Sequence, residues 1–211
     1  MKRWFEKLEN KIKALVKEDY SGHDYWHAIR VCNISKNIGE EEKADTDVLL
    51  AASLLHDVYA GKNYATHVEK AATLANKILM NIGFPQEKIK DVIECIKNHE
   101  KYKWGKTNNI SKEAQILQDS DRIDAIGAIG IARTFAFGGL YRRSIYNPKD
   151  RRSIYFNFKK TKKSSITHFY EKLLRLKDDM NTKTGRKIAE KRHKFMELYL
   201  KEFFKKWEGK T

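Results

Sequence analysis

Histidine and aspartate side chains that could bind a metal or move a proton occur at four separate places in the sequence. They are His23 and His27 near the start, the adjacent pair His56-Asp57, His99, and the acids of the segment Gln118-Asp119-Ser120-Asp121-Arg122-Ile123-Asp124. His23 and His27 are four positions apart, so they share one face of a helix, and Arg30 follows about one turn later. Ionisable residues beside apolar helices are costly to bury unless they are paired or bind a metal.

Imidazole and carboxylate groups contributed by separate helices form a ligand set typical of a metal site. Such a set suits Mn, Fe, Co, Ni or Zn better than Ca or Mg alone. Helices that cross one another hold ligands of this kind rigidly, as the cores of helical bundles do. The residue types therefore predict a site for a divalent metal between helices.

The elements that must position these residues are helices, because apolar residues recur at helical spacing almost throughout the chain. Capping residues such as Asp45 and Ser111, and breaks such as Gly83-Phe84-Pro85, separate one helix from the next. The expected helices cover residues 4–16, 28–38, 48–55, 67–80, 85 to about 99, 112 to about 137, 165 to about 180, and 182–207. No segment is typical of a strand, so the sequence predicts an all-α, compact multi-helix fold. Residues 139–164 are expected to be an irregular basic insertion, a lid or a short hairpin.

The length of 211 residues predicts a single domain, with a metal-binding core at about 20–137 and C-terminal helices at about 165–207 packed on it. Two cysteines, Cys32 and Cys95, are too few for a disulfide scaffold. No apolar run approaches the roughly 20 residues of a membrane helix. The first residues also lack the apolar stretch of a signal peptide. We therefore expect a cytoplasmic protein with no membrane partner.

Positive charge is concentrated in the second half of the chain. Residues 1–100 contain 15 Lys and Arg against 16 Asp and Glu, whereas residues 101–211 contain 28 against 12, a net charge of +16. The segment 141–163 alone has nine basic residues, one acidic residue and several interleaved aromatic residues. Such a segment can bind phosphates or nucleic acid, or it can be a solvated loop whose aromatic residues pack on the protein. No known module for sequence-specific DNA binding accompanies this segment.

The spacing of the histidines and aspartates resembles a known family. His27, His56-Asp57 and Asp121 match the H…HD…D pattern of the HD-domain metal-dependent phosphohydrolases. The flanking residues look like the YedJ/YpgQ-like subgroup, in His23-Asp-x-x-His27-x-x-Arg-Val, Ala52-x-x-Leu-His56-Asp57, Gln118-Asp-x-Asp121-Arg-Ile-Asp-Ala-Ile-Gly-Ala-Ile-Gly-Ile-Ala-Arg133, Thr167-His168-Phe169-Tyr170-Glu171-Lys172, and Gly185-Arg186-x-Ile-Ala189-x-x-Arg192. The resemblance extends from about residue 20 to 207, but it is weaker over 141–163.

The resemblance implies that His27, His56, Asp57 and Asp121 are the protein ligands of one divalent metal. Manganese is the expected metal, and Fe, Co, Ni, Zn or Mg would also be compatible with these ligands. The resemblance further implies that Asp57 contacts both the metal and the attacking water. A metal held in this way would lower the pKa of its water and neutralise charge on a phosphate.

Other residues have two interpretations each. His23 could bind phosphate or shuttle a proton, or it could cap its helix. Arg30 could contact phosphate or form a salt bridge, and His99 could bind substrate or support a second metal. His168 and Lys172 share a helix face, which could point into the cleft or into solvent.

Three residues near the site and two other histidines also have expected roles. Asp124, one turn after Asp121, is expected to orient a ligand imidazole. Arg122 is expected to join helices through acids, and Asp119 could join helices or touch substrate. His67 and His193 are expected to be partly exposed helix residues.

Three functions are compatible with this sequence. The first is a phosphohydrolase acting on a nucleotide or related small phosphate ester, and the resemblance points toward release of pyrophosphate from nucleoside triphosphates. The second is a nucleic-acid-associated or regulatory binding module with little turnover. The third is a closed structural metal site. The apolar first helix could pack on its own domain or against a second copy in a homodimer.

Overall fold

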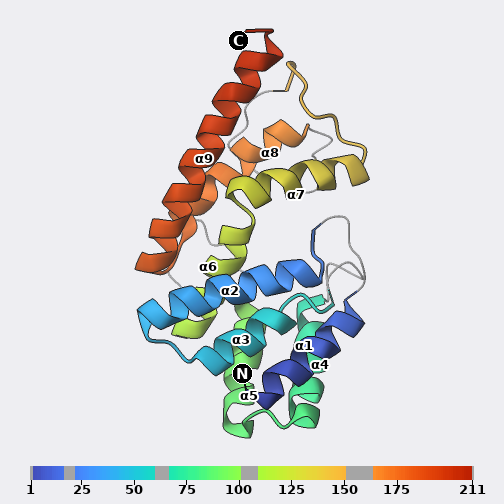
Figure 1. The fold of residues 1–211 in the computed structure, drawn as a ribbon, viewed down its shortest axis with the longest axis vertical. Coiled ribbons are helices and arrows are strands. Elements are labelled where there is room, and N and C mark those ends of the chain that lie inside the picture. Colours follow the sequence, from blue (N-terminus) through green and yellow to red (C-terminus); the bar gives the residue numbers. More distant parts are fainter. Residues whose placement is uncertain (1, 17–21, 60–66, 101–108, 151–163, 211) are drawn as a thin grey trace.

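The computed structural model describes residues 2–16, 22–59, 67–100, 109–150 and 164–210. All regular structure within these residues is helical, which confirms the all-α prediction. The elements are α1 (Arg3–Leu15), α2 (Tyr25–Glu42), α3 (Thr46–Leu55), α4 (His67–Ile82), α5 (Gln86–Asn98), α6 (Lys112–Asp124), α7 (Gly127–Leu140), α8 (Ser165–Glu171), the 3₁₀ helix η1 (Leu173–Asp179) and α9 (Lys183–Trp207). Figure 1 shows α1–α5 gathered at one end of the molecule and α7–α9 toward the other, with α6 running between them.

The lower group of helices is built around α3, which is buried along almost its whole length. Asp45 begins this helix by accepting a hydrogen bond from the Asp47 backbone N–H at 2.9 Å, as the sequence predicts. The apolar stripe of α1 packs against α3 and α4, and Leu8 and Ile12 are fully buried there. The first helix therefore packs on its own chain.

The upper group is joined to α6 by polar contacts as well as by its apolar core. Asp119 on α6 accepts hydrogen bonds from the Thr182 backbone N–H at 2.8 Å and from the Thr182 hydroxyl at 2.7 Å, just before α9 begins. Arg122 donates to the backbone carbonyl of Asp179 and forms an ion pair with its carboxylate at 3.2 Å. Asp119 and Arg122 thus anchor the upper helices to the helix that carries Asp121.

Two expected helices are each divided in the structure. The helix expected over 112–137 ends at Asp124 and resumes as α7 at Gly127, with a bend of 67° between the two parts. Gly127 has a φ of +77°, a conformation that glycine adopts readily and other residues avoid. The segment 165–180 divides at Lys172, whose φ of −132° is not helical, and it continues as a 3₁₀ helix. Among the described helices, no single helix is long and apolar enough to cross a membrane. Only the bent pair α6–α7, taken together, meets these two criteria.

Residues 141–150 begin the basic segment, and residues 151–163 lie outside the described part of the chain. Tyr146 packs edge-on against Phe204 and Trp207 of α9, with ring centroids 5.3 and 5.0 Å apart. Asp150 accepts a hydrogen bond from the Ser164 backbone N–H at 2.9 Å, so the two ends of the segment 150–164 meet. At Tyr146, the structure favours the interpretation in which the aromatic residues pack on the protein.

Candidate functional site

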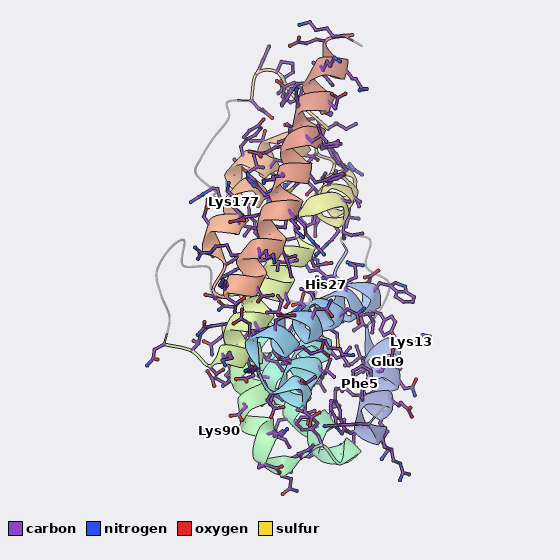
Figure 2. The ribbon with its side chains drawn as sticks, turned by 60° about the vertical axis from the view of Figure 1, so that its left-hand side comes forward. Phe5, Glu9, Lys13, His27, Lys90 and Lys177 are labelled. Carbon is purple, nitrogen blue, oxygen red and sulfur yellow. The ribbon has the colours of Figure 1, made fainter. Side chains whose placement is uncertain are left out.

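Three helix ends bring the predicted metal ligands together. Asp24 caps the start of α2 by accepting from the backbone N–H of His27 at 2.9 Å, and His56-Asp57 follows the last turn of α3. His27 Nε2 lies 3.2 Å from His56 Nε2, 3.6 Å from Asp57 Oδ2 and 3.5 Å from Asp121 Oδ1. Figure 2 shows His27 on α2 at the junction between the lower and upper helices.

The ring orientations of the histidines suit a metal. His56 donates its Nδ1–H to the carbonyl of Ser53 at 2.8 Å, and His99 donates its Nδ1–H to the carbonyl of Ile96 at 2.6 Å. In His56 this bond leaves the Nε2 lone pair for the cluster, and in His99 it turns Nε2 toward Asp57. His27, His56 and Asp57 each offer a ligand atom within 4.8 Å of the others. The donor set of nitrogen and carboxylate oxygen therefore fits a divalent transition metal.

Asp57 divides its two carboxylate oxygens between two sets of neighbours. Oδ2 faces His27 and His56, whereas Oδ1 lies 3.4 Å from Nε2 of the buried His99. Asp57, His99 and Glu100 form a second group whose ligand atoms lie within 4.8 Å of one another. The structure thus places His99 at the site. Our reasoning from sequence missed Glu100, although its position directly after His99 could have indicated it.

A buried carboxylate and two arginines lie behind His27. Asp124 Oδ2 accepts the Nδ1–H of His27 at 2.8 Å. Arg30 donates to both oxygens of Asp124, at 2.7 and 3.1 Å, so its salt bridge is observed. Arg133 on α7 donates to Oδ2 at 2.7 Å. Arg133 was assigned no role from the sequence, because a straight helix would have carried it away from Asp124.

The protonation of the cluster follows from its burial and its hydrogen bonds. Burial alone would lower the pKa of His27, but its bonds to Asp124 and Asp57 outweigh this effect and raise the pKa to about 9. Burial lowers the pKa of His56 to about 4. Burial works against ionisation of Asp57 and Asp121, yet the neighbouring histidines hold the pKa of both carboxyls below its usual range. Two carboxylates and a neutral His56 are therefore ready to bind a cation.

His23 is the candidate proton carrier of the site. Its ring centroid lies 5.6 Å from that of His27, and burial lowers its pKa. The interpretation of His23 as the helix cap is wrong, because Asp24 occupies that position. Asp24 has the shorter oxygen-bearing side chain that reaches the free backbone N–H groups of the first turn.

The remaining predicted residues are His168, Lys172, His193 and His67. Burial, together with the charges of Lys172 and Arg143, lowers the pKa of His168 to about 3. His168 therefore lies near enough to Lys172 and Arg143 to be affected by their charges. His193 is buried and pairs with Glu197 at 3.2 Å, so the expectation of a partly exposed residue is wrong. The side chain of His67 lies outside the described part of the chain.

Comparison with known proteins gives the same family from sequence and from structure. The HD domain family matches residues 25–126, the stretch that carries His27, His56-Asp57 and Asp121. The Bacillus subtilis protein YpgQ is 36% identical over 206 residues, which is 97% of this chain and 94% of YpgQ.

Solved structures of relatives have the same fold. A Lactobacillus plantarum protein superposes with a TM-score of 0.81 at 29% identity, over 99% of both chains. A Bacillus thuringiensis HD-superfamily hydrolase gives a TM-score of 0.74 at 35% identity, over 97% of this chain and 96% of the other. Bacillus subtilis YpgQ in complex with ADP gives a TM-score of 0.73 at 32% identity, over 96% and 94% of the two chains. The chain therefore belongs to the HD-domain family of metal-dependent phosphohydrolases, in its YpgQ-like subgroup.

Proposed function

We propose that this enzyme hydrolyses nucleoside triphosphates or related nucleotides with a divalent metal, preferably manganese, and releases pyrophosphate. The observation that carries the proposal is the convergence of His27, His56, Asp57 and Asp121 on one buried point at the junction of the helices. These four residues would hold the metal. When bound, a divalent cation supplies Lewis-acid activation of water and neutralises charge on the phosphate.

The side chains around the metal ligands have separate tasks. Asp57 would hold a carboxylate oxygen beside the attacking water and so orient that water toward phosphorus. His23 is neutral near pH 7 because burial lowers its pKa, so it can accept a proton at a ring nitrogen and return it to the leaving oxygen. Asp124 orients His27 and is balanced by Arg30, which would also meet an approaching phosphate.

Two observations support a nucleotide as the substrate. The relative YpgQ has been crystallised in complex with ADP. The second half of this chain has a net charge of +16, which favours an anionic ligand. His168 and Lys172, beside Arg143, would contact the part of the nucleotide that lies farther from the metal. His99 would contact the phosphate next to Asp57.

The first experiment is a turnover assay with manganese-loaded protein. A panel of nucleoside mono-, di- and triphosphates is supplied, and pyrophosphate and phosphate are measured separately. Asp57→Ala tests the site, and Asp91→Ala, which replaces an acid on the exposed side of α5, is the matched control. We expect pyrophosphate from triphosphates with the wild type and the control, and none with Asp57→Ala. Phosphate alone would assign a phosphatase, and no turnover by folded, metal-loaded protein would overturn the proposal.

A binding function for nucleic acid is the second candidate, and the charge of +16 in residues 101–211 is what favours it. Binding through phosphate contacts weakens steeply with added salt. Titration of a fluorescent single-stranded oligonucleotide at two salt concentrations tests this candidate. Salt-sensitive binding by protein that lacks turnover would support it, and absence of binding at low salt would exclude it.

A further inference from the structure

Arg133 connects the upper helices to the residues of the metal site. It projects from α7, but its guanidinium lies 2.7 Å from Oδ2 of Asp124, the same oxygen that accepts the Nδ1–H of His27. The Arg133 side chain is only 16% exposed. Nδ1 of His27 itself lies 3.4 Å from Arg133 Nη1. Arg133 is therefore held against the polar atoms that determine the orientation of His27.

The same side chain also packs against the backbone just before α2. A Cβ atom added to Gly22 would lie 2.9 Å from Nε and 3.0 Å from Cγ of Arg133, so the Arg133 side chain would have to shift. Gly22 has a φ of +88°, so the chain turns there in the conformation that favours glycine. His23 is the next residue, and its ring packs edge-on against that of His27. One arginine thus contacts the backbone beside His23 and the carboxylate behind His27.

We propose that Arg133 is a positioning residue that holds both His23 and His27 in place from the opposite group of helices. Through Asp124 it restricts the ring of His27, and through its contact with Gly22 it restricts the backbone that carries His23. Neither task requires contact with substrate. The proposal rests on the roles of His27 in metal binding and of His23 in proton transfer that are proposed above.

The test measures manganese binding without substrate. Metal-free protein is titrated with Mn²⁺, and the free ion is followed by electron paramagnetic resonance, alongside the Tm of each variant. We expect Arg133→Ala to weaken Mn²⁺ binding by about 10- to 100-fold, the usual cost of losing a partner that orients a ligand. Arg133→Lys keeps the charge but loses the planar fork, so its loss is expected to be smaller.

Gly22→Ala provides an independent test, and Gly83→Ala is its matched control. Both glycines have positive φ angles, +88° and +75°, so alanine strains the backbone at either position. Only at Gly22 would the new Cβ meet Arg133, because nothing lies within 4 Å of a Cβ at Gly83. Both variants are expected to lower Tm, but only Gly22→Ala is expected to weaken Mn²⁺ binding and to lower kcat at saturating metal. The loss of affinity caused by Gly22→Ala should shrink in the Arg133→Ala background, since coupled residues are not additive.

The outcomes separate this inference from the proposed function. Wild-type protein that binds no Mn²⁺ would overturn the proposed metal site and this inference with it. Wild-type binding together with unchanged affinity in folded Arg133→Ala would overturn the inference alone. Equal affinities of the Gly22→Ala and Gly83→Ala variants would also overturn it. This glycine comparison decides the matter even where Arg133→Ala does not fold.

Discussion

His27 and Asp124, 97 positions apart in the sequence, are joined by a 2.8 Å hydrogen bond between Nδ1 and Oδ2. Both side chains are only 1% exposed, so the bond is shielded from water. It leaves Nε2 of His27 directed toward His56, Asp57 and Asp121. The hydrogen bond to Asp124 thus fixes the His27 ring with Nε2 toward the metal site, although Asp124 itself lies behind His27.

Replacement of Asp124 tests this relationship. Asp124→Asn removes the charge that holds the Nδ1–H of His27, and we expect Mn²⁺ affinity to fall by about 10- to 100-fold. Asp119→Asn is the control on the same helix, since Asp119 bonds the start of α9 and not His27. That variant should lose stability and keep its Mn²⁺ affinity. Isothermal titration of both metal-free proteins makes the comparison, and equal affinities would contradict the role of Asp124.

The pH dependence of metal binding follows from the raised pKa of His27. That pKa is about 9 in the metal-free fold, so at any pH below about 9 a proton on His27 competes with the metal. We expect Mn²⁺ affinity to rise between pH 6.5 and about 9, by up to about tenfold per pH unit for one displaced proton, and then to level off. Affinity that does not change over this range would show that no such proton is displaced.

The stability of the metal-free protein should fall as the pH rises, whereas its Mn²⁺ affinity should rise. A group whose pKa is raised by folding stabilises the fold fully below its unfolded pKa, and this stabilisation is lost as the pH rises through the folded value. His27 and His99 both have pKa values raised to about 9, so stability is expected to decline from pH 6.5 to about 9. Urea unfolding with a chelator present measures this decline. Saturating Mn²⁺ should reduce this decline, because the metal replaces the proton of His27.

The packing of α1 can be tested through Leu8, which is fully buried. Leu8→Ala leaves a cavity between α1 and α3, and we expect a loss of about 2–5 kcal/mol in the free energy of unfolding. The exposed neighbour Lys7 is the control, since Lys7→Ala should stay within about 0.5 kcal/mol of the wild type. Urea unfolding measures both. A loss for Leu8→Ala as small as that of the control would show that α1 does not pack as described.

The fold and the inner residues of the site could be predicted from sequence, for different reasons. Helical periodicity predicted the helices because each presents one apolar face to the core, as Leu8 and Ile12 do on α1. His27, His56, Asp57 and Asp121 could be singled out because their types and spacing match a family pattern. The pattern also led to Asp124, for which the structure shows the hydrogen bond to His27.

The residues that the sequence did not predict depend on three-dimensional geometry. Arg133 is nine positions after Asp124, a separation of about 13 Å along a straight helix. Only the break before Gly127 brings the two together. The apolar residues on both sides keep the helical spacing, so the sequence pattern does not reveal this break. Gly127 itself was a signal, since a glycine between two apolar helical stretches permits a bend. The burial of His193 likewise depends on how α9 packs, which its own sequence does not determine.

The bend between α6 and α7 also limits how the chain can change in length. The break between the helices consists of Ala125 and Ile126 alone, so one residue inserted between Asp124 and Gly127 would displace the start of α7 relative to Asp124. Arg133 would then leave Asp124, and the backbone beside His23 would lose its support. Surface connections elsewhere usually tolerate insertions. In this connection we expect a single inserted residue to be as damaging to metal binding as the loss of a side chain at the site.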